Sequence, residues 1–429
     1  MITAVAAILT FKNKIFVIKR NEKLRAFPGY TSFPGGKVDE GENLLQALER
    51  ELKEELDFDI SSAQKKGEIK KIVEFGKAQT PGFNPIRFAT HYFKIELQNI
   101  PRFDLNSHEI ALARWEMADY FMDDFNQGNL LMVPPVRTII SLLAKDHQME
   151  GADVQYRYDE DSKVPMIEFM GGIRQLLVRS HTLPPALYTN AFIIGDENKG
   201  RVLVDPSPKD EKEFVKLQNT IEDQKIEGVF LTHHHADHNQ QVDRLASLLK
   251  IPVKLSEDSF NRIKKREGNN YFKGLEVRFF REGDVLNTSL GEEVICLEVP
   301  GHDEGQLALA PRSYKWCLVG DLIQTVGTVV VGGEEGNMKK YFNSLQRIIE
   351  LAPRFVMPSH GNIMGGVEKL QLTLSHRQNR ETQILDLFNQ GKTAKQMLDI
   401  IYQGVDEKLL PFAMENIKSH LKKLGLSYK

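Results

Sequence analysis

The chain has 429 residues, of which 41% are hydrophobic and 27% charged, so two or three domains of a soluble globular protein are expected. A formal net charge of −3 argues against a surface that binds polyanions throughout, and no apolar stretch approaches membrane-spanning length. The only cysteines are Cys296 and Cys317, which excludes a disulfide framework and favours a reducing, cytoplasmic compartment.

The first predicted elements are strands over residues 1–11 and 14–18, both of them apolar runs. The opening run has neither a basic leader nor a cleavage site, so it indicates a strand and not a signal peptide. A helix is predicted near residues 44–56, more strands follow it, and a final helix comes after Pro135. We therefore expect a first domain over residues 1–144.

A carboxylate cluster lies on the helix predicted near residues 44–56. Glu51, Glu54 and Glu55 are spaced i, i+3 and i+4, so their side chains point the same way. Three like charges on one helix face cost stability unless a cation neutralises them. Oxygen ligands at this spacing suit Mg²⁺ or Mn²⁺ and a diphosphate substrate. A solvated acidic helix would explain the carboxylates alone, but not the glycine-containing loop that precedes them.

The string Gly36-x5-Glu42-x7-Arg50-Glu51-Leu52-Lys53-Glu54-Glu55 resembles the Nudix box, which implies a Nudix α/β/α sandwich. The resemblance implies that Glu51, Glu54 and Glu55 bind the metal and that Glu54 and Glu55 are catalytic. It also implies that Gly36, Glu42 and Arg50 brace the turn between loop and helix. Asp57 stands where the family usually has Gly, and Asp tolerates the left-handed conformation better than most residues.

Further strings in this domain resemble the coenzyme A diphosphatase-like branch of the Nudix enzymes. They are Thr80-Pro81, residues 87–93, Trp115 and residues 131–135. This resemblance implies a bulky, coenzyme A-like nucleotide diphosphate as the substrate. Three arginines are candidates for contact with its phosphates, although each would equally fit a surface charge: Arg20, Arg25 and Arg87.

The segment 145–165 is predicted to be a linker, because it is polar and rich in acidic residues. Strand-like runs resume at residues 175–178, 191–194 and 201–206, and a helix is expected over residues 209–223. Strands then alternate with helices to about Gly366. This alternation predicts a sandwich of two sheets flanked by helices over residues 166–366.

The run Thr232-His233-His234-His235-Ala236-Asp237-His238 follows a short apolar strand within this second domain. Neutral imidazole suits Zn²⁺, and a neighbouring carboxylate suits a second metal that carries water. A polar surface loop or a purification-tag scar would also be rich in histidine, but the internal position and the presence of Asp and Ala argue against a tag. Other strand-like runs end at His302, Asp321 and His360, each beside a residue that permits a tight backbone turn.

This order of segments is similar to the motif of the metallo-β-lactamase superfamily, which implies an αββα sandwich. The resemblance implies two Zn²⁺ ions: His233, His235 and His302 hold one, Asp237, His238 and His360 hold the other, and Asp321 bridges them. His234 matches a variable position and is not expected to be a ligand. Two nearby metals lower the pKa of a shared water, and Asp237 would orient this nucleophile. The reaction is therefore hydrolysis of a phosphodiester, thioester, ester or amide.

Residues 367–429 have helical periodicity, and two of their strings resemble the winged-helix tail of the lactamase-β-like endoribonucleases. The strings begin at His376-Arg377 and at Asn416 and extend to Leu385 and Leu424, respectively. A helical lid that packs beside the metal site would have the same periodicity. This stretch holds ten Lys or Arg against seven Asp or Glu, so the electrostatic argument for nucleic-acid binding is weak.

Three functions follow from these resemblances. In the first, the chain is a two-headed hydrolase: a Nudix head cleaves a nucleoside diphosphate-linked compound, and a dizinc head cleaves a phosphodiester, with single-stranded RNA as a candidate substrate. In the second, the dizinc head is a thioesterase for acyl-coenzyme A or an acyl-carrier protein. In the third, one head is retained for binding or regulation only. Aromatic or Arg side chains along the cleft would favour RNA, and a narrow apolar slot a thioester.

Overall fold

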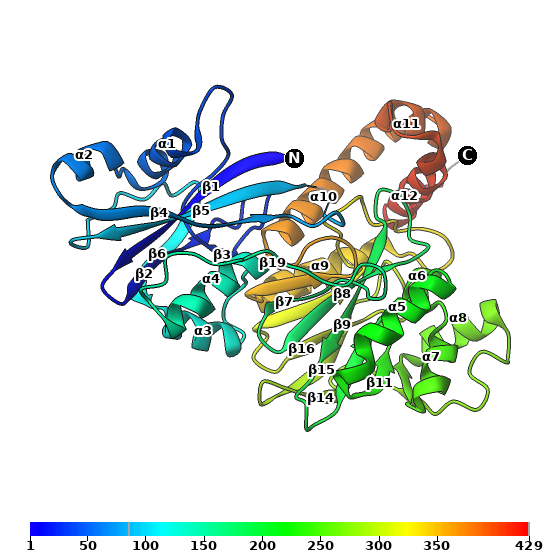
Figure 1. Cartoon of the computed structure of the whole chain (residues 1–429). Helices are drawn as coiled ribbons and strands as arrows, with labels where there is room; N and C mark the ends of the chain where they lie inside the picture. Colours follow the sequence, from blue (N-terminus) through cyan, green and yellow to red (C-terminus); the bar gives the residue numbers. More distant parts are fainter. Residues whose placement is uncertain (85, 428–429) are drawn as a thin grey trace. The chain divides into compact units, whose positions relative to one another are not determined.

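The computed structural model describes residues 1–84 and 86–427, and the chain forms two compact units (Figure 1). The first unit comprises Met1–Tyr158 together with Ile167–Gly172. The second comprises Asp159–Met166 and the chain from Ile173 onward. The division after Tyr158 falls inside the segment 145–165 that the sequence predicts as a linker, so most of that segment is part of the first unit.

The first unit is a single mixed sheet with helices. Its strands are β1 (Ile2–Phe11), β2 (Lys14–Arg20), β3 (Thr31–Ser32), β4 (Ile69–Gln79), β5 (Phe88–Leu97) and β6 (Ile110–Met117). Strand β7 (Met166–Met170), except for its first residue, also belongs to this unit but is not a strand of this sheet. Its helices are α1 (Leu44–Leu56), α2 (Ile60–Lys65), α3 (Ala118–Asn126) and α4 (Pro134–Lys145). The strand order is β3-β2-β1-β5-β4, with β6 paired to β2, and only β1 and β5 run parallel among these pairs.

Alternation along β1 creates the predicted α/β/α sandwich. Val5 and Leu9 pack in one core cluster with residues of α1, whereas Ala6 and Ile8 pack in another with residues of α3 and α4. Successive strand residues point to opposite faces, so a strand that is apolar at every position is buried on both. The continuous hydrophobic run that opens the sequence is therefore a central strand.

Helix α1 begins and ends where its local chemistry dictates. Asn43 accepts hydrogen bonds from the backbone of Leu45 and Gln46, and the Gln46 side chain returns a contact to the Asn43 backbone, which completes a capping box. At the other end, Asp57 adopts φ +54°, the left-handed conformation that commonly ends helices. The replacement of the usual Gly by Asp therefore keeps the expected helix end.

The second unit contains two sheets. The first sheet includes β8 (Ile173–Arg179), β9 (Tyr188–Ile194), β10 (Arg201–Val204), β11 (Ile226–Phe230), β12 (Val253–Leu255) and β13 (Val277–Phe279). The other consists of β14 (Val285–Ser289), β15 (Glu292–Glu298), β16 (Leu307–Pro311), β17 (Trp316–Gly320), β18 (Phe355–Pro358) and β19 (Met364–Gly365), in that order. The helices between them are α5 (Glu211–Ile221), η1 (Glu222–Gln224), α6 (Ala236–Asn239), α7 (Val242–Leu249), α8 (Glu257–Glu267) and α9 (Met338–Leu351).

These layers form the predicted sandwich of two sheets flanked by helices. Helices α5, α7 and α8 share buried clusters with the strands of the first sheet, and α9 shares one with the second sheet. Asn190 joins the sheets, because its side-chain amide donates to the carbonyls of Pro358 and Gly361, 2.8 Å away in each case. Loops at the strand ends carry the histidines and aspartates considered below.

The C-terminal region consists of α10 (Glu368–Asn389), α11 (Ala394–Ile401), η2 (Glu407–Leu409) and α12 (Leu410–Lys423). Its small core includes Ile384, Met397, Ile417 and Leu421. Within residues 366–427 the structure has no strand, so this region is helical throughout its described length. Of the helices in the described parts of the chain, none is long and apolar enough to span a membrane.

A buried polar contact joins α10 and α12 to the segment 329–331. Arg377 donates to the carbonyl of Val329 and, at 3.1 Å, to Asn416 Oδ1, which also accepts from the backbone of Val331 at 2.9 Å. Arg377 additionally lies 5.7 Å from the ring centre of Tyr341. The two tail strings that the sequence singles out therefore meet each other through Arg377 and Asn416.

We expect Asn416→Ala to lower the free energy of unfolding of the second unit by about 1–3 kcal/mol, because it leaves Arg377 and the Val331 amide without this buried acceptor. Thermal and denaturant unfolding would measure the change. Asn389→Ala, at the exposed end of α10, is the matched control, and an equal loss in both variants would contradict the argument.

Candidate active sites

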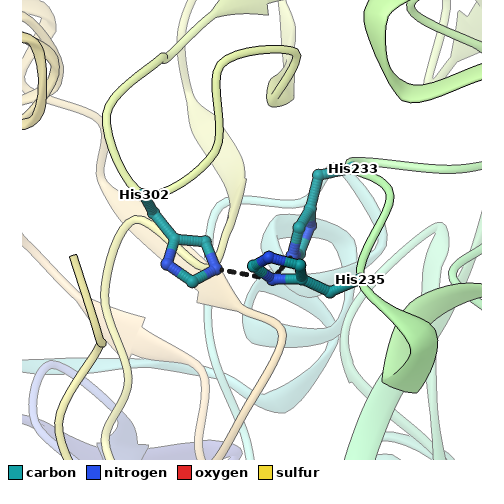
Figure 2. Close-up of side chains that lie close together, drawn as sticks. All are labelled: His233, His235 and His302. Carbon is teal, nitrogen blue, oxygen red and sulfur yellow. Dashed lines mark hydrogen bonds between the residues drawn. The ribbon is translucent and has the colours of Figure 1, made fainter. Parts of the chain in front are cut away.

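Three imidazoles converge in the second unit. His233 and His235 come from the loop after β11, and His302 comes from the loop after β15 (Figure 2). The Nδ1 atom of His235 lies 3.0 Å from Nε2 of His233 and 3.0 Å from Nε2 of His302. The three nitrogens thus surround one point, as tetrahedral zinc sites require of their protein ligands.

The opposite nitrogen of each ring faces an acceptor. His302 Nδ1 donates to the Val330 carbonyl at 2.6 Å, and His235 Nε2 donates to Glu335 at 3.0 Å. His233 Nδ1 lies 3.0 Å from the hydroxyl of Thr232, which itself donates to a carboxylate. With protons on these outer nitrogens, all three inner nitrogens carry lone pairs. Three lone pairs that face one point repel one another, but a cation at that point can accept all three.

A second group lies beside the first and is joined to it by Asp321. Oδ1 of Asp321 is 3.4 Å from His360 Nε2 and 3.7 Å from His238 Nε2, whereas Oδ2 is 3.8 Å from His302 Nε2. Asp237 Oδ2 lies 3.4 Å from His360 Nε2. The two oxygens of Asp321 therefore face different groups, which is the geometry that a bridging carboxylate needs.

The chemistry of the second group also fits a cation. The buried atoms His238 Nε2, His360 Nε2 and Asp321 Oδ1 have no hydrogen-bond partner within the described protein. Burial alone would lower the pKa of His360, but Asp321 and Asp237 outweigh it and raise the pKa to about 10. The carboxylates thus favour positive charge here. By contrast, burial lowers the pKa of His302 to about 4, so this ring is neutral at pH 7, as a ligand must be.

Sequence reasoning missed three carboxylates that support these groups. Asp205 is fully buried and accepts from His238 Nδ1 at 2.9 Å and from Thr232. Asp303 contacts His234, the residue not expected to be a ligand, and Glu335 contacts His235. Asp205 directly follows strand β10, so the strand-end rule would have found it. Glu335 lies in a loop without any motif and becomes apparent only in three dimensions.

The carboxylates of the first unit surround a glycine loop. Gly35 N donates to Glu55 Oε2 at 2.8 Å, and a Cβ atom on Gly36 would lie 2.4 Å from the carboxylate of Glu51. A side chain at position 36 would therefore force the Glu51 carboxylate to move. Burial raises the pKa of Glu51, and it raises the pKa of Glu55 to about 8. Charge on these groups is costly unless a cation is near.

Arg50 is the cation that these carboxylates contact in the structure. Its guanidinium lies 2.8 Å from Glu42, 2.9 Å from Glu51 and 3.3 Å from Glu54. A hydrogen bond to the Lys37 carbonyl, 2.8 Å long, fastens Arg50 to the loop, in keeping with a bracing role. Among the described residues, the groups with three ligand atoms within 4.8 Å of one another all lie in the second unit.

Beside these carboxylates lies a cavity of about 490 Å³. Glu51 and Glu54 line it, and Glu55 lies behind them against Gly35. Oxygen donors at the wall of a cavity suit Mg²⁺ or Mn²⁺. Of the three predicted phosphate contacts, Arg20 lines the cavity, whereas Arg25 and Arg87 are exposed and do not belong to its described lining.

Comparisons with known families assign each region. Residues 1–131 match the model of the NUDIX domain, residues 184–360 match that of the metallo-beta-lactamase superfamily, and residues 393–425 match that of the beta-lactamase associated winged helix domain. The first two matches contain the carboxylate site and the His/Asp centre, respectively.

Individual relatives are similar to part of this chain. A beta-lactamase-like protein 2 homolog of Drosophila melanogaster is 26% identical over 249 residues, 55% of this chain and 82% of the relative. A hydroxyacylglutathione hydrolase of Bdellovibrio bacteriovorus is 23% identical over 198 residues, 44% and 73% of the two chains. A beta-lactamase domain protein from Burkholderia ambifaria shares the fold, with a TM-score of 0.52 and 20% identity over 63% of this chain and 89% of that one.

Proposed function

We infer that this metal-dependent hydrolase, which combines a NUDIX domain, a metallo-β-lactamase superfamily domain and a winged helix domain, has two active sites that cleave different bonds. One is the His/Asp centre of the second unit, and the other is the carboxylate site of the first. The observation that carries this proposal is the convergence of ligand-type side chains around Asp321 in the second unit, together with a separate glutamate-lined cavity within the first unit.

In the His/Asp centre we assign His233, His235 and His302 to one metal, Asp237, His238 and His360 to the other, and Asp321 to both. Two bound Zn²⁺ ions supply Lewis acidity and lower the pKa of a water molecule. The protein supplies orientation, because Asp205, Glu335 and the carbonyls of Val330 and Tyr188 fix the imidazole rings. Asp237 is only partly buried, so its carboxylate can accept a hydrogen bond from the attacking water.

For this centre we propose an acyl thioester as the substrate. Relatives named hydroxyacylglutathione hydrolase, from Bdellovibrio bacteriovorus and Dictyostelium discoideum among others, support thioester chemistry. The charged side chains near the centre also favour a thioester over RNA, because the three cations named next are already paired with carboxylates. Arg262 contacts Asp258 and Glu335, Arg266 contacts Glu267, and Lys340 contacts Glu304. A track for an RNA backbone needs positive charge that is available to phosphates.

For the carboxylate site we propose hydrolysis of a nucleoside diphosphate-linked compound, with coenzyme A as one member of that class. Glu51, Glu54 and Glu55 would hold Mg²⁺ or Mn²⁺, and Arg20 would meet a phosphate from within the cavity. If coenzyme A derivatives occupy both sites, the two heads act on related compounds.

A substrate screen of the full-length protein tests both assignments. Protein loaded with Zn²⁺ and Mg²⁺ is offered acyl-coenzyme A, S-lactoylglutathione, a single-stranded RNA oligonucleotide and coenzyme A, with release of free thiol, RNA fragments or phosphorylated products as the readouts. We expect thiol release from an acyl thioester and diphosphate cleavage. RNA cleavage without thiol release would overturn the thioester assignment, and no turnover at one centre would favour a binding or regulatory role for that head.

Glu335 provides a test that does not depend on the substrate. Its hydrogen bond with His235 lowers the pKa of Glu335, so an ionised carboxylate accepts a hydrogen bond from the protonated Nε2 and leaves Nδ1 free to bind metal. We expect Glu335→Ala to weaken zinc binding about 10- to 100-fold, measured by chelator competition, and Glu335→Gln to restore part of the loss. Glu276→Gln, at an exposed site, is the control. If Glu335→Ala binds zinc as tightly as the parent, Glu335 does not orient His235 for metal binding.

A further inference from the structure

The cavity of the first unit is completed by residues that lie beyond the part of the chain matched by the NUDIX model. That match ends at residue 131, yet Tyr156, Ile167 and Phe169 line the cavity. They come from the stretch between α4 and β8, most of which the sequence predicts as a linker. The part of this stretch that belongs to the first unit therefore supplies one wall of the cavity, which we call the added wall (residues 147–158 and 167–169).

Backbone contacts fasten the beginning of the added wall to the edge strand β4. Ala152 N donates to the Phe75 carbonyl at 2.8 Å, and the Gln155 side chain binds both the amide and the carbonyl of Gln79, at 2.6 and 3.0 Å. A Cβ atom on Gly76 would lie 2.5 Å from the Ala152 carbonyl, so a glycine is needed for this approach. Tyr156 directly follows Gln155, and its position is fixed by these contacts.

The end of the added wall is held equally well. Phe169 O accepts from Met132 N at 2.8 Å, and Glu168 forms an ion pair of 2.9 Å with Arg137 on α4. The ring of Phe169 meets the ring of Tyr30 edge-on, with 5.9 Å between the ring centres. Tyr30 in turn packs against Phe27. Phe169 is thus part of an aromatic group that the sheet and its loops share with the added wall.

The cavity is lined by two kinds of side chain, charged and aromatic. Glu51, Glu54 and Arg20 provide charge, whereas aromatic side chains contributed by several segments provide flat apolar surface: Phe27, Tyr30, Phe83, Phe88, Tyr92, Tyr156 and Phe169. A volume of about 490 Å³ lies in the range of small-molecule sites. Aromatic rings bind the faces of nucleobases by stacking, with little dependence on which base is present.

We propose that the added wall, through Tyr156 and Phe169, binds the base of a nucleoside diphosphate-linked substrate whose diphosphate lies at Glu51 and Glu54. This inference rests on the function proposed for the carboxylate site and adds the residues that select its substrates. Tyr156 and Phe169 act in binding and not in bond cleavage, so their loss raises KM and the Kd for nucleotides and leaves kcat nearly unchanged.

The test uses full-length protein and two probes, ADP and base-free ribose 5-phosphate, titrated calorimetrically with Mg²⁺ present. We expect Tyr156→Ala and Phe169→Ala each to weaken ADP binding about tenfold or more, to change ribose 5-phosphate binding less than about twofold, and to raise KM for a dinucleotide with kcat within about threefold. Tyr156→Phe keeps the ring and should bind ADP as the parent does. Tyr120→Ala removes an exposed ring outside the cavity lining and is the matched control.

The outcomes separate this inference from the proposed function. If the parent protein binds ADP but cleaves no diphosphate, the hydrolysis proposed for the carboxylate site is wrong, whereas the proposed base site is still supported. Equal loss of ADP and ribose 5-phosphate binding, or no loss of either, would overturn the base site whatever the catalytic result. If Tyr156→Ala fails to fold, Tyr156→Leu, which keeps apolar volume without a ring, decides the question by the same measurements.

Discussion

Asp321→Ala is expected to abolish turnover at the His/Asp centre and to leave diphosphate hydrolysis at the carboxylate site at the parent rate. The two oxygens of Asp321 face different groups of ligands, so one substitution removes a donor from both proposed metals. It also removes one of the carboxylates that face His238 and His360. A loss of at least about a thousandfold is expected, because metal-centred charge stabilisation contributes several kcal/mol. Rates with a thioester and with a diphosphate substrate, measured on one preparation, provide the comparison.

The control for Asp321→Ala is Asp223→Ala, which removes an exposed carboxylate from the same unit. Metal analysis of the purified protein adds a readout that does not depend on choosing the right thioester, since Asp321→Ala should retain less zinc than the control. Loss of both activities in folded Asp321→Ala protein would refute the idea of two independent heads.

Glu54→Gln is expected to have the opposite selectivity. Glu54 lines the cavity with its side chain 57% exposed, whereas the Glu51 side chain is 11% exposed, so Glu54 is more open than Glu51 to a bound metal and substrate. Glutamine keeps the size of the side chain and removes its charge. We expect diphosphate hydrolysis to fall at least about a hundredfold, with thioester hydrolysis unchanged.

Glu49→Gln is the matched control for Glu54→Gln, because it makes the same chemical change on the same helix. Glu49 accepts a hydrogen bond from Ser61 N at 3.0 Å, which glutamine also can accept. Equal activity in Glu49→Gln and Glu54→Gln would show that the charge of Glu54 is not needed. A Glu54→Gln protein that loses thioester hydrolysis as well would show that the heads depend on each other.

Local patterns in the sequence predicted much of the fold. Helix α1 occupies residues 44–56 as expected, because the capping box at Asn43 and the left-handed Asp57 are local features. The predicted helix over residues 209–223 is shorter in the structure, Glu211–Ile221, since Asp210 caps its start and a 3₁₀ turn follows. The histidines and aspartates at strand ends converge because neighbouring strands end at one edge of the sandwich.

Features that depend on contacts distant in sequence were not predictable in this way. The polar composition of residues 145–165 indicates a linker, yet the Ala152 amide and the Gln155 side chain form hydrogen bonds with β4, and composition does not encode such contacts. Glu335 contacts His235, which lies 100 positions earlier in the chain, and Glu335 belongs to no motif. Asp303, adjacent to His302 in sequence, was overlooked because its partner His234 occupies a position that varies in the family.

The polar contact between Arg377, Asn416 and the segment 329–331 has a consequence for how far the catalytic machinery extends. Arg377 donates to the carbonyl of Val329, and Asn416 accepts from the amide of Val331. The carbonyl between them, that of Val330, accepts a hydrogen bond from His302 Nδ1. Helices α10 and α12, which carry Arg377 and Asn416, thus help to hold the His302 ring in position. The C-terminal helices are, in this respect, a support of the proposed metal centre, and a chain shortened before α12 is expected to lose activity at this centre even if every proposed ligand is retained.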